Sequence, residues 1–444
     1  MEDKQGLISA LTSTRDRILG LVQSLEEEQL SVPYHPGVNP PLWELGHSMF
    51  FYEVFILSAL DGTPSYDPAM DELWDSFHMS HGERWSRTLF PDRNDTLAYA
   101  RAVYRQLLER LEREPLTDQA LYLYRYGIYH QNMHIESMIW CRQTVGYPRP
   151  DFTESGAPVG SPLEAGADVT IPGGDYRIGY PEQPRDLARQ DFAFDNEKPG
   201  CTVTLAQFNI SRTLVSNAEF LQFVQDGGYQ RPELWSQGGR QWLARERDNA
   251  FGTGAAPQVA TPAQPFHWRW IEGHWQERLF NEWLPLAPAH PVRQIAYWEA
   301  EAYCQWAGRR LPTEFEWEAA ALGNRPGSPF QRFPWGDTMD AHRVDMDGRA
   351  MGRVPVTAYA PGDSASGCRQ MIGTVWEWTS SQFLPYDGFA MDMYPYMSVL
   401  QFGDHKVSRG GSCATTASLI RGTYRQAYFP DRTDVFTGFR TCAR

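Results

Sequence analysis

With 444 residues, the chain is too long for one ordinary hydrophobic core, so two domains are expected. Its net charge of −15 argues against nucleic acid and against an anionic membrane surface as partners. No apolar run approaches the length that spans a membrane, and the acidic, amphipathic start lacks the apolar core of a signal peptide. The six cysteines lie far apart without a CxxC pair, which favours reduced thiols and a cytoplasmic location.

The first 150 residues are expected to form an α-helical domain. Apolar residues recur at helical spacing in the first segment, and the second segment begins with prolines, which suit the entrance of a helix. Four segments in all show helical patterns, over residues 7–25, 40–60, 96–112 and 118–145. A four-helix bundle is the simplest arrangement of four such helices.

The sequence changes in character after this domain. The stretch GYPRPDFTESGAPVGSP is rich in proline, glycine and serine, and it predicts a linker at residues 151–165. Residues 166–444 contain short apolar runs with many glycines, prolines and tryptophans, and only SNAEFLQFVQDGG and YWEAEAYCQWAGRRLPTEFEWEAAALG look helical. The expected fold class is therefore α+β, with a compact, loop-rich second domain stabilised by buried tryptophans rather than by a large regular sheet.

Two histidines in the fourth helical segment, His130 and His134, are candidate metal ligands. They are four residues apart, so on a helix both imidazoles face one side and can bind one ion. Two histidines in a polar bundle interior would show the same spacing, so the pair alone does not decide. His47 lies in the otherwise apolar second segment and supplies a third candidate. Three neutral histidines predict a centre with open positions on zinc, iron or nickel.

Two neighbouring residues limit the chemistry of this centre. Glu136 lies about 200° around the helix from His134, so we expect it outside the ligand set, paired with another helix or with the second domain. Gln131 occupies the position of the glutamate in the HExxH motif, so peptide hydrolysis is not supported.

The motifs LWELGH and HQNMHIE resemble the DinB-type helical domain of the iron enzymes that attach sulfur or selenium to histidine betaine (hercynine), the ergothioneine sulfoxide synthase family. The second half is similar to their partner domain, the formylglycine-generating-enzyme/sulfatase-modifying fold, which is related to C-type lectins. The similar pieces occur in order: IPGGDYRIG, FAFDNEKP, RRLPTEFEWEAAA, FPWGD, GCRQMIGTVWEWTSS, KVSRGGSCAT and FTGFRTCAR. The copper-binding cysteine pair of formylglycine-generating enzymes has no clear equivalent.

This resemblance implies a mononuclear non-heme Fe(II) centre, with O₂, hercynine and a chalcogen donor as substrates. We expect this centre at the junction of the two halves. It implies that Tyr394 is the catalytic tyrosine that supplies a proton or hydrogen atom to reduced oxygen, with Tyr396 and Tyr386 as rivals. The alternative for Tyr394 is a packed surface aromatic residue. The implied ligands of the iron are His47, His130 and His134.

The stretch RQAYFPDRTD departs from the family members that use γ-glutamylcysteine. Arg432 matches the arginine that holds this donor there, but Tyr428 stands in the place of the aspartate. Gln426 and Ala427 stand where an asparagine and a tryptophan line the betaine pocket, and Asp431 is too far along the chain to restore the charge. A donor with a γ-glutamyl ammonium group is therefore not expected.

The stretches VNPPLWELGH and HGERWSRTLFPDR resemble the selenoneine synthase branch, whose donor is a neutral, hydroxyl-rich selenosugar. Arg84 and Trp85 then become candidates for the donor pocket, although a surface arginine and a core tryptophan would look the same. The resemblance favours formation of a C–Se bond between hercynine and a selenosugar. The alternative is an ergothioneine sulfoxide synthase that uses cysteine or γ-glutamylcysteine.

Two hypotheses from other classes remain. A thiol-dependent transferase would carry zinc at the histidines, and a binding protein would recognise a ligand without turnover. An enzyme is favoured, because a structural metal more often has all its positions filled by protein ligands. Cys413 and Cys442 are expected to be small buried residues, with contact to the donor as the alternative.

Overall fold

A computed structural model describes residues 3–86, 88–151, 167–181, 192–248 and 263–444. The predicted linker at 151–165 lies outside the described residues except for its first position. The chain divides into a helical unit of residues 3–150 together with Phe192, and a second unit of residues 167–181 and 193–444. No helix among the described residues is long and apolar enough to cross a lipid bilayer. None of the six cysteines forms a disulfide, and Cys413 and Cys442 are fully buried.

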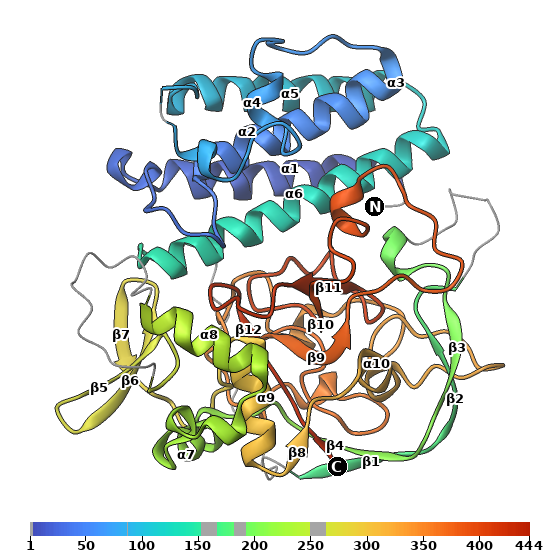
Figure 1. Ribbon diagram of the computed structural model, residues 1–444. Helices are drawn as coiled ribbons and strands as arrows, with labels where there is room; N and C mark the ends of the chain where they lie inside the picture. Colours follow the sequence, from blue (N-terminus) through green and yellow to red (C-terminus); the bar gives the residue numbers. More distant parts are fainter. Residues whose placement is uncertain (1–2, 87, 152–166, 182–191, 249–262) are drawn as a thin grey trace. The chain divides into compact units, whose positions relative to one another are not determined.

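The helical unit is the predicted four-helix bundle, and Figure 1 shows its long helices side by side. Thr117 caps the start of the last helix by accepting a hydrogen bond from the backbone N–H of Ala120, and Gly146 ends it in a left-handed conformation. The four helices are α1 (Lys4–Gln23), α2 (Pro41–Tyr52), α5 (Arg93–Arg113) and α6 (Asp118–Val145).

Helices α2 and α6 approach closely because Gly127 has no side chain. A Cβ atom at this position would lie 2.7 Å from the ring of Tyr52. One turn further along α6, the buried Gln131 accepts hydrogen bonds from the hydroxyls of Tyr52 (2.9 Å) and Tyr104 (2.5 Å), which ties α2, α5 and α6 together. A π-helical turn (Glu53–Ser58) and α3 (Ala59–Asp61) continue α2.

The connection between α3 and α5 packs against the side of α2. It contains α4 (Asp71–Trp74) and a 3₁₀ turn (Gly82–Trp85). Trp74 lies against Gly46 of α2, where a Cβ atom would meet the indole at 2.5 Å. The indole N–H of Trp43 donates to the carbonyl of Leu73 at 3.1 Å. A long connection is thereby fixed to the helix that carries His47.

The second unit is α+β, with small sheets as predicted (Figure 1). The first sheet has the order β1 (Asp168–Ile171), β4 (Phe208–Ser211), β13 (Cys442–Ala443) and β8 (Arg309–Arg310). The second has the order β11 (Arg425–Tyr428), β10 (Lys406–Arg409), β9 (Trp376–Gln382) and β12 (Thr437–Gly438). The remaining strands are β2 (Gly174–Ile178) with β3 (Cys201–Leu205), and β5 (Trp268–Ile271), β6 (His274–Leu279) and β7 (Glu282–Pro285).

The predicted helical stretches of this unit form α7 (Asn217–Gln225), α9 (Tyr297–Trp306) and α10 (Glu314–Leu322). A further helix, α8 (Gln237–Asp248), was not predicted, because its sequence is polar and has two glycines in the first turn. The expected buried tryptophans are present: Trp317, Trp376 and Trp378 are each at most 1% exposed.

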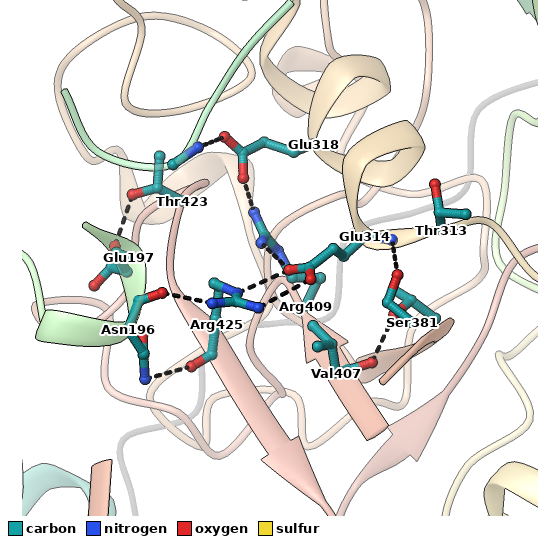
Figure 2. A network of polar contacts seen from close by, with 12 residues as sticks. Asn196, Glu197, Thr313, Glu314, Glu318, Ser381, Val407, Arg409, Thr423 and Arg425 are labelled. Carbon is teal, nitrogen blue, oxygen red and sulfur yellow. Dashed lines mark hydrogen bonds and ion pairs between the residues drawn. The ribbon is translucent and has the colours of Figure 1, made fainter. Parts of the chain in front are cut away.

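Buried ion pairs join α10 to the second sheet (Figure 2). The guanidinium of Arg425 donates to both oxygens of Glu314, at 2.8 and 2.9 Å. Arg409 pairs with Glu318 and also approaches Glu314, at 3.5 Å. Arg425 donates further to the carbonyl of Asn196 at 2.6 Å. The network therefore fixes strand β11. This strand carries two of the predicted substrate-binding residues, Gln426 and Tyr428, and the chain reaches a third, Arg432, just after it.

Candidate metal centre

The structure brings together the three histidines that the sequence singles out. His47 comes from α2, and His130 and His134 come from successive turns of α6. Their ligand nitrogens all lie within 4.8 Å of one another, and the Nε2 atoms of His130 and His134 are 3.2 Å apart. His47 and His130 are buried, and the side chain of His134 is 15% exposed. One ion can therefore contact all three imidazoles.

Hydrogen bonds at Nδ1 orient two of the rings. Nδ1 of His47 lies 2.7 Å from the carbonyl oxygen of Trp74, and Nδ1 of His134 contacts the carboxylate of Glu44. Both partners are acceptors, so each Nδ1 carries the proton and each Nε2 is left as the free metal-binding atom. The donor set thus fits a metal with three nitrogen ligands.

Glu44 is the residue of this centre that sequence reasoning missed. Its carboxylate is 1% exposed and accepts further hydrogen bonds from Ser137 (2.5 Å) and Asn39 (3.0 Å). Burial alone would raise the pKa of Glu44, but the charge and hydrogen bond of His134, together with these two donors, lower it to about 2. The carboxylate therefore stays ionised and holds His134 in one orientation.

Aromatic packing fixes the remaining freedom of the imidazoles. The ring of Trp43 stacks on His47 with 4.7 Å between centroids and an interplanar angle of 7°. Phe51 stacks on His130 at 3.8 Å and 15°.

Burial and the neighbouring charge of His134 lower the pKa of His47 to about 3, and the same causes lower that of His130. Both imidazoles are therefore neutral at pH 7, as a metal ligand must be.

Three imidazole ligands suit Fe(II) and leave coordination positions open. Glu136, in agreement with its position on the helix, is not among the residues whose ligand atoms converge. It is 2% exposed, and its expected pairing with another helix or with the second domain remains a prediction.

We expect the substitution Glu44→Gln to weaken metal binding by about 10- to 100-fold, the usual effect of losing a carboxylate that orients a ligating histidine. The affinity of the metal-free protein for Co(II), measured by titration, checks this. The matched control is Glu109→Gln on the exposed face of α5, which should leave the affinity unchanged. A Glu44→Gln protein that binds Co(II) within twofold of the wild type would contradict the role of Glu44.

Tyr394 lies in the second unit, immediately before a 3₁₀ turn (Pro395–Met397), and is 6% exposed. Asp195 holds both sides of this turn, since its carboxylate accepts from the backbone N–H of Asp392 (3.1 Å) and from the hydroxyl of Ser398 (2.7 Å). Asn196 donates from its amide to the carbonyls of Met397 (2.6 Å) and Arg425 (3.4 Å). The turn that carries Tyr394 is thereby tied to β11.

The two rival tyrosines differ in their surroundings. Tyr396 is half-buried beside Tyr394, with 5.5 Å between ring centroids. Tyr386 is buried under the guanidinium of Arg425, 4.0 Å from the ring centroid, and its hydroxyl donates to Glu314 at 3.4 Å. Tyr386 therefore belongs to the buried ion-pair network formed by Arg425 and Glu314.

Gln426 and Tyr428 lie on β11, and Arg432 lies four residues beyond Tyr428. Gln426 and Tyr428 are two residues apart on the strand, so they share a face, and Arg432 lies over the ring of Tyr428 at 5.5 Å. Arg432 donates to both oxygens of the buried Asp434, at 2.6 and 2.5 Å. Sequence reasoning missed Asp434. Asp431, by contrast, pairs with Arg245 and Trp298.

Arg84 and Trp85 line a cleft of about 360 Å³ in the helical unit, together with Trp43 and Phe90. The indole N–H of Trp85 donates to the carbonyl of Val32 at 2.8 Å. The guanidinium of Arg84 is 3.8 Å from the centroid of the Trp43 ring and donates to the side-chain oxygen of Asn39 at 2.8 Å.

Comparison with known proteins assigns both halves. Residues 10–138 match the DinB superfamily, and residues 155–444 match the sulfatase-modifying factor enzyme 1-like domain. Hercynine oxygenase of Mycolicibacterium smegmatis is 34% identical over 447 residues, covering 98% of each chain. That of Mycolicibacterium thermoresistibile is 33% identical, covering 98% of this chain and 94% of the relative. Formylglycine-generating enzyme of Streptomyces coelicolor is 29% identical, covering 67% of this chain and 96% of that enzyme.

The chain thus falls in the class of proteins that combine a DinB-superfamily domain with a sulfatase-modifying factor enzyme 1-like domain. Within this class, identity of a third extends over nearly the whole of both chains. The chain belongs to the hercynine oxygenase family. The predicted fold class and the predicted relationship to this family are thereby confirmed, and the family supports the prediction that the chain is an enzyme.

Proposed function

We propose that the protein is a non-heme Fe(II)- and O₂-dependent synthase that joins selenium from a selenosugar to the imidazole of hercynine. The observation that carries the proposal is the group of three converging histidines, two of them oriented by Glu44 and by the carbonyl of Trp74, in a chain related to hercynine oxygenases. Fe(II), when bound, would supply the activation of O₂. The other steps rest on the protein's own residues.

His47, His130 and His134 would hold the iron, and the carboxylate of Glu44 would keep Nε2 of His134 pointing to it. Tyr394 would donate its phenolic proton as oxygen is reduced, which requires hydrogen-bond reach. The fixed turn around Tyr394 supports this role, because a proton donor must be held in place. We place the enzyme in the cytoplasm.

A neutral donor is supported by the charges at β11. Tyr428 is buried and makes edge-on contacts with the rings of Trp376 and Trp378, and Arg432 is neutralised by Asp434. A γ-glutamyl group, which carries an ammonium and a carboxylate, would need two opposite charges from its site. The hydroxyls of a sugar need only hydrogen bonds, such as those that Gln426 offers. The cleft beside Arg84 and Trp85 is our candidate for further donor contacts.

The test is aerobic turnover of Fe(II)-reconstituted protein with hercynine and, in parallel, a selenosugar, cysteine or γ-glutamylcysteine, with products identified by mass spectrometry. We expect a selenium adduct, formed fastest from the selenosugar, with consumption of O₂. A sulfoxide from either thiol would make the protein an ergothioneine sulfoxide synthase. Stoichiometric zinc without O₂ consumption would indicate a transferase, and binding without turnover would indicate a binding protein.

The same assay tests Tyr394. The Tyr394→Phe protein should keep its iron and lose most of its turnover, whereas Tyr396→Phe is the matched control and should retain it. Equal turnover of Tyr394→Phe and wild type would remove Tyr394 from the mechanism.

A further inference from the structure

We propose that Arg84 is a positioning residue of the metal centre. It acts on two of the histidines by two separate routes, on His134 through hydrogen bonds and on His47 through stacked planar groups. The proposal rests on the three-histidine centre of the proposed function, and it gives Arg84 a role that does not depend on the donor. Arg84 lies in the connection between α3 and α5, outside the helices that carry the histidines.

The first route is a chain of hydrogen bonds. Nη1 of Arg84 donates to Oδ1 of Asn39 at 2.8 Å, and Nδ2 of Asn39 donates to Oε1 of Glu44 at 3.0 Å. The other oxygen of Glu44 accepts from Nδ1 of His134. The guanidinium fixes which end of the Asn39 amide faces Glu44, because a guanidinium can only donate. Arg84 thereby keeps the side-chain N–H of Asn39 directed at the carboxylate of Glu44, which orients His134.

The second route is a stack of planar groups. The guanidinium of Arg84 lies 3.8 Å from the centroid of the Trp43 ring, and the Trp43 ring is nearly parallel to the imidazole of His47. The N–H of the indole is held by the carbonyl of Leu73. A cation over an indole attracts it electrostatically and limits its movement. Arg84 thus restrains the ring against which His47 rests.

An arginine serves both routes at once. Its planar guanidinium can stack on an indole while its edge donates to an amide oxygen, whereas the ammonium of a lysine cannot stack in this way. Arg84→Lys should therefore keep part of the first route and weaken the second. Arg84→Met should lose both, with little change in side-chain volume.

The experiment is titration of the metal-free, full-length protein with Co(II), followed by the visible absorption bands of the bound ion. We expect Arg84→Met to weaken binding by about tenfold and to shift these bands, as loss of an outer partner does. Arg84→Lys should lie between Arg84→Met and the wild type. The matched control is Arg101→Met on the exposed face of α5, which removes the same charge and should bind Co(II) normally.

A double-mutant cycle tests the first route. If Arg84 acts through Asn39, then Arg84→Met and Asn39→Ala together should weaken binding by less than the product of their separate effects. Binding within twofold of the wild type and unchanged bands in both Arg84 variants would overturn the proposal. A rise only in the KM for the donor would then assign Arg84 to the donor pocket alone.

Two further measurements keep the outcome clear. Far-ultraviolet circular dichroism shows whether each variant is folded, and if Arg84→Met is not, Arg84→Lys and Trp43→Phe provide the test. If His134→Ala binds Co(II) as tightly as the wild type, then the three-histidine centre itself has failed. If His134→Ala loses Co(II) while the Arg84 variants keep it with unchanged bands, only the role of Arg84 is overturned.

Discussion

Replacing His134 with alanine is expected to abolish stoichiometric iron binding and turnover while the helices remain folded. His134 supplies one of three converging nitrogens, so the loss of affinity should exceed the 10- to 100-fold typical of an outer partner. The fold should survive because the side chain is partly exposed and water can reach the site it leaves. Iron content after reconstitution and desalting, together with circular dichroism, measures both effects.

The matched control is His78→Ala. His78 is 63% exposed in the same unit and pairs with Asp75, so its loss should leave the iron content unchanged. A His134→Ala protein that retains one iron per chain would remove His134 from the ligand set. Loss of iron in both variants would point to damage of the connection between α3 and α5 instead.

The substitution Arg425→Met is expected to lower the free energy of unfolding by about 3–5 kcal/mol, the cost of leaving one member of a buried ion pair without its partner. Arg425 is 1% exposed, donates to both oxygens of Glu314 and also donates to two backbone carbonyls (Figure 2). Methionine has a similar length but donates no hydrogen bond. Urea titration followed by tryptophan fluorescence measures the change.

An exposed ion pair in the same unit provides the control. Arg231 is 41% exposed and pairs with Asp226, so Arg231→Met should cost no more than about 1 kcal/mol. If Arg425→Met costs as little, the pairing in Figure 2 does not stabilise the unit. If the loss is large, adding Glu314→Gln should recover part of it, because the unpaired carboxylate is then removed.

The bundle and its histidines could be predicted because spacing along one helix determines which side chains share a face. His130 and His134 needed only this rule, and His47 was marked by its apolar surroundings. Glu44 could not be found in this way. It contacts His134 across 90 residues of sequence, and such a contact depends on how α2 packs against α6. The carbonyl of Trp74 is a backbone atom, which no residue type can signal.

In the second unit, too, local sequence patterns predicted some elements, whereas contacts between distant residues could not be predicted. Two helical stretches and the buried tryptophans followed from the sequence. The polar helix α8 and the three-stranded sheet β5–β7 did not, because α8 is polar with two glycines near its start and the three strands are only four to six residues long. The departure at Tyr428 was visible in the sequence, but the pairing of Arg432 with Asp434 appeared only with the turn that follows β11.

The contact between Gly46 and Trp74 has a consequence for protein engineering. The indole can lie against α2 only because position 46 has no side chain, and the carbonyl of the same tryptophan orients His47. Grafting the three histidines and Glu44 onto another four-helix scaffold would therefore not reproduce this centre. The graft would also need the connection that supplies the carbonyl and a glycine at the point where it docks.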